Sequence, residues 1–342
     1  MLKKISLIIF TASITIVIFN SCEKGTEPER SKIKPGRRDY IWTEDTLNLN
    51  YHFAMTFQDI MGNSPNDIWL GSVNASYGEG LWHYDGVEWK SIFFPGYAAS
   101  ALWVFEDNTL WIGTEDNILW KRENGAWVDS VKIELEGYDM ILIYELYGKA
   151  KDDIYAVGWA VKTIVVSYEY ENKGIILHYD GVKWKFVNIP DLEDGFHSIL
   201  YDEKNNMFFI YGSKDLLDIL YVFDGKKIRA IMSTYAGFGL SKINGRVYIN
   251  SNKKVFIYSN NSLVLWKDFT GTDFWSNFVG RSETDFFNTS AKGVGHYNGI
   301  DYITIYETDM ELYNKVIFDK DIFIVAENQN HVYKIIHGRL KD

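Results

Sequence analysis

Several features that usually narrow down the function of a protein are scarce in this sequence. Cys22 is the only cysteine among 342 residues, so no disulfide can form within the chain. Basic residues number 35 and acidic residues 46. This excess of acid argues against nucleic acid as a partner, because proteins that bind nucleic acid need a basic face. Only 5 residues are proline, and no apolar run reaches the ~20 residues that a membrane-spanning helix requires.

The residue patterns of common catalytic and metal sites are also missing. The sequence has no His-Glu-x-x-His, no Gly-x-Ser-x-Gly, no phosphate-binding loop, no dinucleotide fingerprint and no Asp-x-Asp-x-Asp-Gly calcium loop. We therefore expect no metal, no cofactor and no catalysis of these kinds.

The N-terminal segment has the pattern of a secretory signal peptide. Lys3 and Lys4 precede an apolar run over residues 5–19, which is too short to span a membrane. The residues that follow, 19–22, read Phe-Asn-Ser-Cys. They resemble the lipobox of bacterial lipoproteins, with Phe19 in place of the usual leucine. The resemblance implies cleavage before Cys22 and lipidation of its thiol, which leaves no thiol for catalysis.

The resemblance also implies a cellular address and a division of the chain. Glu23 follows the cysteine, whereas an aspartate there would suggest retention at an inner membrane. We therefore expect an anchor in the outer membrane, with the protein periplasmic or surface-exposed. Residues 1–21 are predicted to be the lipoprotein signal peptide, 22–37 a flexible tether rich in charge, Pro and Gly, and 38–342 a folded domain.

Aromatic residues make up 16% of the chain, which favours strands, and they recur in a pattern. A His-Tyr-Asp/Asn-Gly segment followed by an aromatic residue occurs three times. Weaker copies at 124–125, 224–225, 260–261 and 337–338 bring most of the spacings close to forty residues. Short apolar runs such as 67–71, 110–113 and 153–158 precede these marks and predict buried strands. Asp-Gly and Asn-Gly between two strands predict tight hairpins of type I′, which need positive φ at both central residues.

Four strands in each of seven units of about forty residues predict an all-β fold, a seven-bladed β-propeller, with six or eight blades as alternatives. The Leu-Trp-Ile-Gly-Thr strand at 110–114 and the Tyr-Asp-Gly hairpins resemble two-component-regulator-type propellers. The span 38–342 is also similar to uncharacterised exported propellers of Bacteroidota and Ignavibacteria, and that similarity implies no particular activity.

The last repeat lacks an outer strand, because only four residues follow His337-Gly338. Residues 39–47 alternate like a strand and carry Trp42, yet no hairpin precedes them. We expect this N-terminal strand to complete the seventh blade and to close the ring.

The repeated His-Tyr-Asp-Gly residues are interpreted as structural rather than metal-binding. Equivalent positions in a propeller lie in different blades, much farther apart than a shared metal permits. The element also resembles the Asp box of sialidase-like propellers, which is structural, but it lacks the leading Ser or Thr. The residues assigned to this structural repeat are His83, Asp85, Gly86, Trp89, His178, Asp180, Gly181, Trp184, His296, Asn298, Gly299 and Trp42. Isolated carboxylates such as Glu145, Asp152, Asp202 and Asp285 are expected on the solvated surface.

Two insertions supply the candidate binding residues. Both fall between the second and third strands of a blade, at 73–79 and 159–173, so both belong to one face of the propeller. Loops on a rigid scaffold are frequent binding sites, and Tyr and Trp give large contact areas at low entropic cost. The candidates are Trp159, Tyr168, Tyr170 and Tyr77. The alternative is that their rings pack within a longer hairpin and have a structural role only.

The sequence therefore predicts a monomeric, membrane-anchored propeller without catalysis that binds a protein or glycan of the cell envelope on its loop face. A carbohydrate-active hydrolase or lyase of the cell envelope is one alternative. An extracellular sensory or assembly module is another.

Overall fold

The structure, a computed structural model, describes residues 36–47, 55–164, 169–275 and 277–342. These ranges hold 28 strands and no helix, and therefore no helix long and apolar enough to cross a membrane. Cys22 and Tyr168 lie outside the described residues. All the strands belong to one compact unit, residues 34–342.

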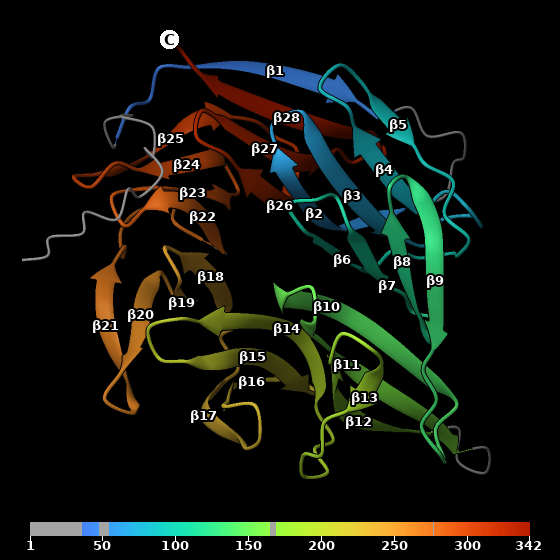
Figure 1. Cartoon of the computed structure of the whole chain (residues 1–342). Coiled ribbons are helices and arrows are strands. Elements are labelled where there is room, and N and C mark those ends of the chain that lie inside the picture. The colour runs from blue at the N-terminus through green and yellow to red at the C-terminus, as the bar shows by residue number, and fades with distance from the viewer. Residues whose placement is uncertain (1–35, 48–54, 165–168, 276) are drawn as a thin grey trace, which may run out of the picture. The chain divides into compact units, whose positions relative to one another are not determined.

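The strands form seven antiparallel sheets of four strands each (Figure 1). We number the sheets as blades 1 to 7 in chain order and give the inner strand of each first. Blade 1 is β2 (Thr56–Ser64), β3 (Asp67–Val73), β4 (Leu81–Tyr84) and β5 (Trp89–Ser91). Blade 2 is β6 (Ala101–Val104), β7 (Leu110–Gly113), β8 (Ile118–Glu123) and β9 (Ala126–Lys132). Blade 3 is β10 (Met140–Ala150), β11 (Asp153–Ile164), β12 (Glu169–Tyr179) and β13 (Trp184–Phe186). Blade 4 is β14 (Gly195–Asp202), β15 (Met207–Lys214), β16 (Leu217–Phe223) and β17 (Ile228–Thr234).

The remaining three blades complete the set. Blade 5 is β18 (Gly239–Ile243), β19 (Arg246–Ser251), β20 (Lys254–Ser259) and β21 (Ser262–Asp268). Blade 6 is β22 (Phe278–Ser282), β23 (Asp285–Ser290), β24 (Gly293–Tyr297) and β25 (Tyr302–Glu307). Blade 7 is β26 (Glu311–Ile317), β27 (Asp321–Glu327), β28 (Tyr333–Leu340) and, as its outer strand, β1 (Tyr40–Thr46).

The inner strands of successive blades contact one another all the way round, including β26 of blade 7 and β2 of blade 1. The fold is therefore the predicted seven-bladed β-propeller. Its N-terminal strand closes the ring as predicted, because β1 pairs with β28 from Tyr40–Leu340 to Thr46–Lys334. Trp42 lies over Gly338, where an added Cβ would come within 2.4 Å of the indole ring.

The residues before β1 add a second fastening, to blade 6. The Arg38 guanidinium donates to the carbonyl oxygens of His296 (3.1 Å) and Asp301 (2.9 Å), and it forms an ion pair with the Asp301 carboxylate. One basic side chain therefore ties the start of the closing strand to the neighbouring blade.

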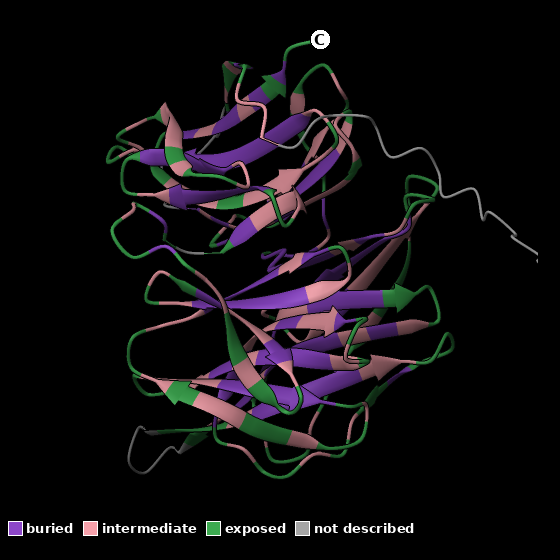
Figure 2. Ribbon diagram, turned by 90° about the vertical axis from the view of Figure 1, so that its left-hand side faces the viewer, coloured by how far each residue is buried: buried purple, intermediate pink, exposed green. Residues whose placement is uncertain are grey.

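The core lies between the faces of adjacent blades. The second strands are buried on both faces, which explains why they read as continuous apolar runs in the sequence. All four residues of β7 are buried, whereas the outer strand β9 is largely exposed. Figure 2 shows this contrast, with buried residues gathered along the middle of the sheets. One cluster joins blades 2 and 3 and another joins blades 7 and 1, so ring closure also buries apolar area.

The hairpins between third and fourth strands occur where the sequence predicts them, but most are not of the predicted type. Positive φ at both central residues is found at Asn124-Gly125 and at Asn260-Asn261. In the other four, the side-chain oxygen of the leading Asp or Asn accepts backbone N–H groups two and three residues ahead. Asp180, for example, accepts from Val182 at 3.1 Å and from Lys183 at 3.0 Å. The same caps are formed by Asp85, Asp224 and Asn298.

The leading Asp or Asn therefore acts as a hydrogen-bond acceptor for the backbone of its own hairpin. Only the glycine that follows it, such as Gly181 at φ +84°, has the left-handed conformation. His337-Gly338, read as a weak hairpin mark, lies within β28 instead, because β1 supplies the fourth strand.

The repeated histidines pair with aspartates at the start of the second strand. His83, His178, His296 and His337 bond through Nε2 to Asp67, Asp153, Asp285 and Asp321 at 2.6–2.8 Å. Each imidazole also packs on the aromatic residue two positions after that aspartate, as His337 does on Phe323 with ring centroids 4.0 Å apart. The four pairs lie in blades 1, 3, 6 and 7.

The expectation of solvated carboxylates is wrong at two of the four positions. Asp202 and Asp285 are 0% and 4% exposed. Asp202 accepts the Val247 N–H at 2.9 Å and so joins blade 4 to blade 5. Glu145 is only partly accessible, and Asp152 is exposed as expected.

Candidate functional site

The two ends of the propeller differ in what they carry. At one end lie the turns between first and second strands and the capped hairpins between third and fourth strands; we call this end the hairpin face. At the other end lie the connections from second to third strands and from one blade to the next; we call this end the loop face. Both predicted insertions belong to the loop face.

The structure places the predicted binding residues at separate points of the loop face. Tyr77, 54% exposed, contacts the rings of Phe93 and Tyr97 beside blade 1. Tyr170, 67% exposed, lies on β12 of blade 3. Trp159 is half-buried on β11, so most of the second insertion is strand rather than loop.

Trp159 belongs to a half-buried group of rings that we call the aromatic platform: Tyr144, Trp159, His197, Tyr211 and Phe238. The Tyr144 ring stacks on Trp159 with centroids 4.2 Å apart, and His197 meets both rings edge-on. Gly195 permits this packing, because a Cβ there would come within 2.5 Å of the indole ring. Burial lowers the pKa of His197, which favours the neutral imidazole. The platform is built from blades 3 and 4 and the connection to blade 5, and it is not free of charge, because the Tyr211 hydroxyl donates to the Asp218 carboxylate at 2.8 Å.

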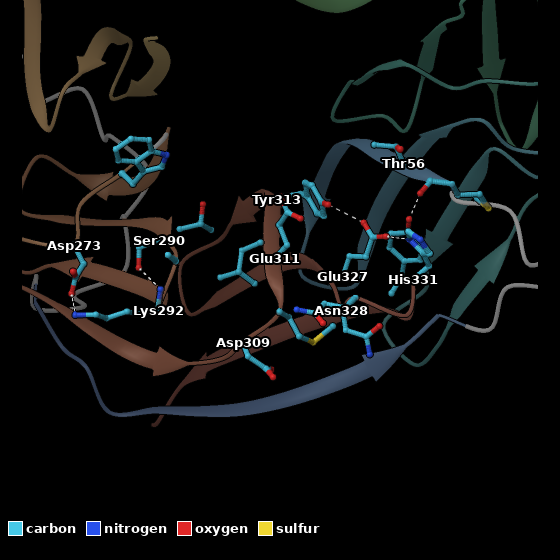
Figure 3. A pocket seen from close by; sticks show the side chains of 18 of the residues that line it. Thr56, Asp273, Ser290, Lys292, Asp309, Glu311, Tyr313, Glu327, Asn328 and His331 are labelled. Carbon is cyan, nitrogen blue, oxygen red and sulfur yellow. Dashed lines mark hydrogen bonds and ion pairs between the residues drawn. The ribbon is translucent and has the colours of Figure 1, made fainter. Parts of the chain in front are cut away.

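A large cavity on the loop face lies elsewhere, mainly at blades 6 and 7 (Figure 3). We call it the cleft; its volume is about 1060 Å³. Its lining combines aromatic, carboxylate and amide side chains with two methionines. The residues are Met55, Thr56, Lys253, Asp273, Trp275, Thr289, Ser290, Ala291, Lys292, Asp309, Met310, Glu311, Leu312, Tyr313, Glu327, Asn328, Gln329, His331 and Tyr333.

Glu327 is held firmly at one side of the cleft. Its carboxylate accepts the Tyr313 hydroxyl at 2.9 Å and is 2.6 Å from His331 Nδ1, as the dashed lines in Figure 3 show. These bonds lower the pKa of Glu327 although burial opposes them. Glu327 is therefore an ionised, fixed group that orients Tyr313.

The remaining charges of the cleft are three carboxylates, Asp273, Asp309 and Glu311, and two lysines, Lys253 and Lys292. Lys292 is paired with Asp273 at 2.9 Å. Asp309 and Glu311 are exposed and have no ion-pair partner among the described residues. Trp275, 64% exposed, presents its ring at the rim. Hydrogen-bond acceptors beside an exposed ring suit a hydroxyl-rich ligand, and four lining carboxylates against two lysines disfavour an anionic one.

Two smaller cavities lie on the same face. One, of about 250 Å³, is lined by residues 236–239, 250–253, 274, 275 and 277 of blade 5 and its flanking connections. The other, of about 420 Å³, is lined by residues 138, 170–173, 191–193 and 213–215 between blades 3 and 4. It contains the predicted Tyr170. Sequence reasoning missed the cleft and the smaller blade 5 cavity, because no motif marks residues drawn from several blades.

The described residues contain no group of three or more His, Cys, Asp or Glu side chains that could hold a metal ion. The two described carboxyl groups whose pKa is raised most, Asp59 to about 7 and Glu145 to about 8, do not line the cleft.

No family model matches the sequence, and no curated protein matches it. Solved structures match its fold. The β-propeller domain of Cps50 (Swd1) from Myceliophteria thermophila is 10% identical, with a TM-score of 0.57 over 86% of this chain and 99% of that chain. BBS1N, solved in complex with ARL6DN, is 12% identical, with a TM-score of 0.56 over 90% and 98%. The Dos1 propeller is 11% identical, with a TM-score of 0.54 over 83% and 78%. At these identities the likeness establishes the β-propeller fold alone.

Proposed function

We propose that the chain is an exported, monomeric propeller, anchored through lipidated Cys22 in the outer membrane, that binds a neutral glycan in the cleft without catalysis. The cleft carries this proposal. It is large enough for a small oligosaccharide, and it combines the exposed Trp275 ring with many hydrogen-bonding groups.

Binding fits the cleft better than glycoside hydrolysis does. A hydrolase needs one carboxyl group with a raised pKa as the general acid. In the cleft, the hydrogen bonds from Tyr313 and His331 hold the pKa of Glu327 below its ordinary value. Its fixed carboxylate serves instead to hold Tyr313, whose hydroxyl donates to Glu327 and whose oxygen can still accept from a ligand.

The binding test uses the mature chain, residues 22–342, with Cys22→Ser to omit lipidation. A glycan array, followed by calorimetric titration with the best neutral oligosaccharide, should give saturable binding, and Trp275→Ala should weaken it about tenfold, the equivalent of ~1.4 kcal/mol. Tyr235→Ala is the matched control, because this ring is 79% exposed and lines none of the three cavities. A folded protein that binds no glycan, or that binds protein partners through this face instead, would refute the proposal.

The anchor is tested separately in cells. Metabolic labelling with an alkyne analogue of palmitate should label the full-length chain and should not label the Cys22→Ser variant. Equal labelling of the two would reject the anchor and leave the binding proposal intact.

A further inference from the structure

The cavities of the loop face are connected rather than isolated. Lys253 and Trp275 line both the cleft and the cavity of about 250 Å³. Phe238 lines that second cavity and packs on Tyr211 of the aromatic platform, with ring centroids 4.7 Å apart. The first two cavities therefore lead directly to the platform.

The platform leads on to the third cavity. Its His197 Nε2 lies 2.6 Å from Ser213 Oγ, and Ser213 lines the cavity of about 420 Å³ together with Tyr170. The series of cleft, smaller cavity, platform and third cavity therefore runs from blade 7 to blade 3; we call it the track.

The track alternates rings with polar groups. Trp275, Phe238 and Tyr170 follow one another from the cleft to the third cavity, and the aromatic platform lies between Phe238 and Tyr170. Within the platform, Tyr144 and Gly195 cover the Trp159 ring, so Trp159 contributes by holding the platform in place. Between them lie amides and hydroxyls such as Asn250, Ser251 and Ser213. An alternation of this kind suits a chain of sugar rings, whose apolar faces stack on aromatic rings while their hydroxyls take hydrogen bonds.

We propose that the track binds a linear, neutral polysaccharide along several successive subsites, rather than one terminal sugar in the cleft. This inference rests on the proposed function and names its ligand class. The cleft at one end of the track has four carboxylates against two lysines, which disfavours a polyanionic chain. An extended peptide is the less suitable occupant, because it gains affinity by adding a strand to a sheet edge, and the outermost strands of the blades lie away from the track.

If the track binds a polysaccharide, affinity should depend on the number of sugar units in the ligand. Once one sugar unit is held in the cleft, the next units are present at the neighbouring subsites at high effective concentration, so each added contact increases affinity. A single-sugar site would gain little from units beyond those it encloses.

The experiment compares a dimer and a hexamer of the neutral oligosaccharide that binds best, using the mature Cys22→Ser chain and calorimetric titration. We expect the hexamer to bind at least tenfold more tightly than the dimer. Trp159→Ala and Tyr170→Ala should remove most of that advantage while leaving dimer affinity unchanged. Trp275→Ala should weaken both ligands.

Tyr170 is 67% exposed, so its replacement keeps the test valid if Trp159→Ala disturbs folding, which a thermal melt would reveal. Equal affinities for dimer and hexamer, abolished by Trp275→Ala, would overturn the track and preserve the proposed function. A length advantage that survives both Trp159→Ala and Tyr170→Ala would also overturn it. Competition by an extended peptide but by no oligosaccharide would overturn both.

Discussion

The hairpin face and the loop face are built by opposite rules. On the hairpin face, the same contacts recur. An Asp or Asn side chain caps the hairpin in four blades. In four blades, a His–Asp pair also joins the third strand to the start of the second strand. On the loop face, the connections differ from blade to blade, and the cleft and the two smaller cavities lie there. The recurring residues stabilise each sheet, while the irregular ones are free to form a binding surface.

The comparison predicts that changes at the hairpin face and at the ring closure affect stability, whereas changes in the track affect binding. The largest effect should come from deleting residues 38–46. This removes β1, its pairing with β28 along seven residues and the Arg38 contacts, and it leaves the edge of β28 open.

We expect the deletion to cost ~5 kcal/mol. For a domain of this size, with an unfolding entropy of roughly 0.6 kcal/mol/K, such a loss lowers the melting temperature by about 8 °C. Differential scanning calorimetry provides the measurement. An unchanged melting temperature would show that closure by the N-terminal strand is dispensable.

The next prediction has a smaller effect on stability and compares two His–Asp pairs that make the same hydrogen bond but differ in burial. Asp285 is 4% exposed and holds both buried His296 and Arg281, whose Nε lies 3.0 Å away. Asp285→Ala removes the acceptor of His296 Nε2 and the counter-charge of Arg281 in the interior, although Arg38 and Tyr40 still contact these two side chains, and it should cost about 3 kcal/mol.

Asp67→Ala is the matched variant, because Asp67 makes the same bond to His83 in a more accessible setting, and we expect a loss of only about 1 kcal/mol. Urea unfolding of the two variants measures the difference, and glycan affinity of the folded protein should stay constant in both. Equal losses would mean that burial does not set the strength of these pairs.

Sequence reasoning was effective where structure is set by neighbouring residues. The second strands, the hairpin positions and the closing role of residues 39–47 follow from apolar runs, Asp-Gly pairs and one missing strand. It failed on the geometry within the hairpins, because Asp180 and its equivalents act through their side-chain oxygens, which a backbone turn rule does not consider.

The binding surface was only partly accessible to sequence reasoning. Trp159 and Tyr170 stood out as aromatic residues in an insertion, whereas Trp275 and Tyr313 resemble the many aromatic residues of the core. Burial of Asp202 was unforeseen, because it depends on a backbone N–H of the next blade. Side chains that meet across blades leave no local pattern.

The smallest predicted effect concerns pH. Burial raises the pKa of Asp59 to about 7 and that of Glu145 to about 8, and each carboxyl accepts a backbone N–H of the following blade at 2.8 Å. Because the folded chain binds these protons more tightly than the unfolded chain, the stabilisation is complete below pH ~4 and is lost as pH rises through the two raised values. Burial lowers the pKa of Lys315 to about 8, so its contribution changes in the opposite direction above that pH.

Between pH 5 and 8, the melting temperature should therefore fall, by an amount equivalent to about 1 kcal/mol or more per carboxyl once partial solvent access is allowed for. Asp59→Asn with Glu145→Gln should flatten this slope. Glycan affinity should remain the same at pH 7 and pH 8, because Glu327 in the cleft has a lowered pKa and stays ionised. If affinity follows stability through this range in the parent protein, the inner strands and the loop face are coupled, and the separation of scaffold from binding surface fails.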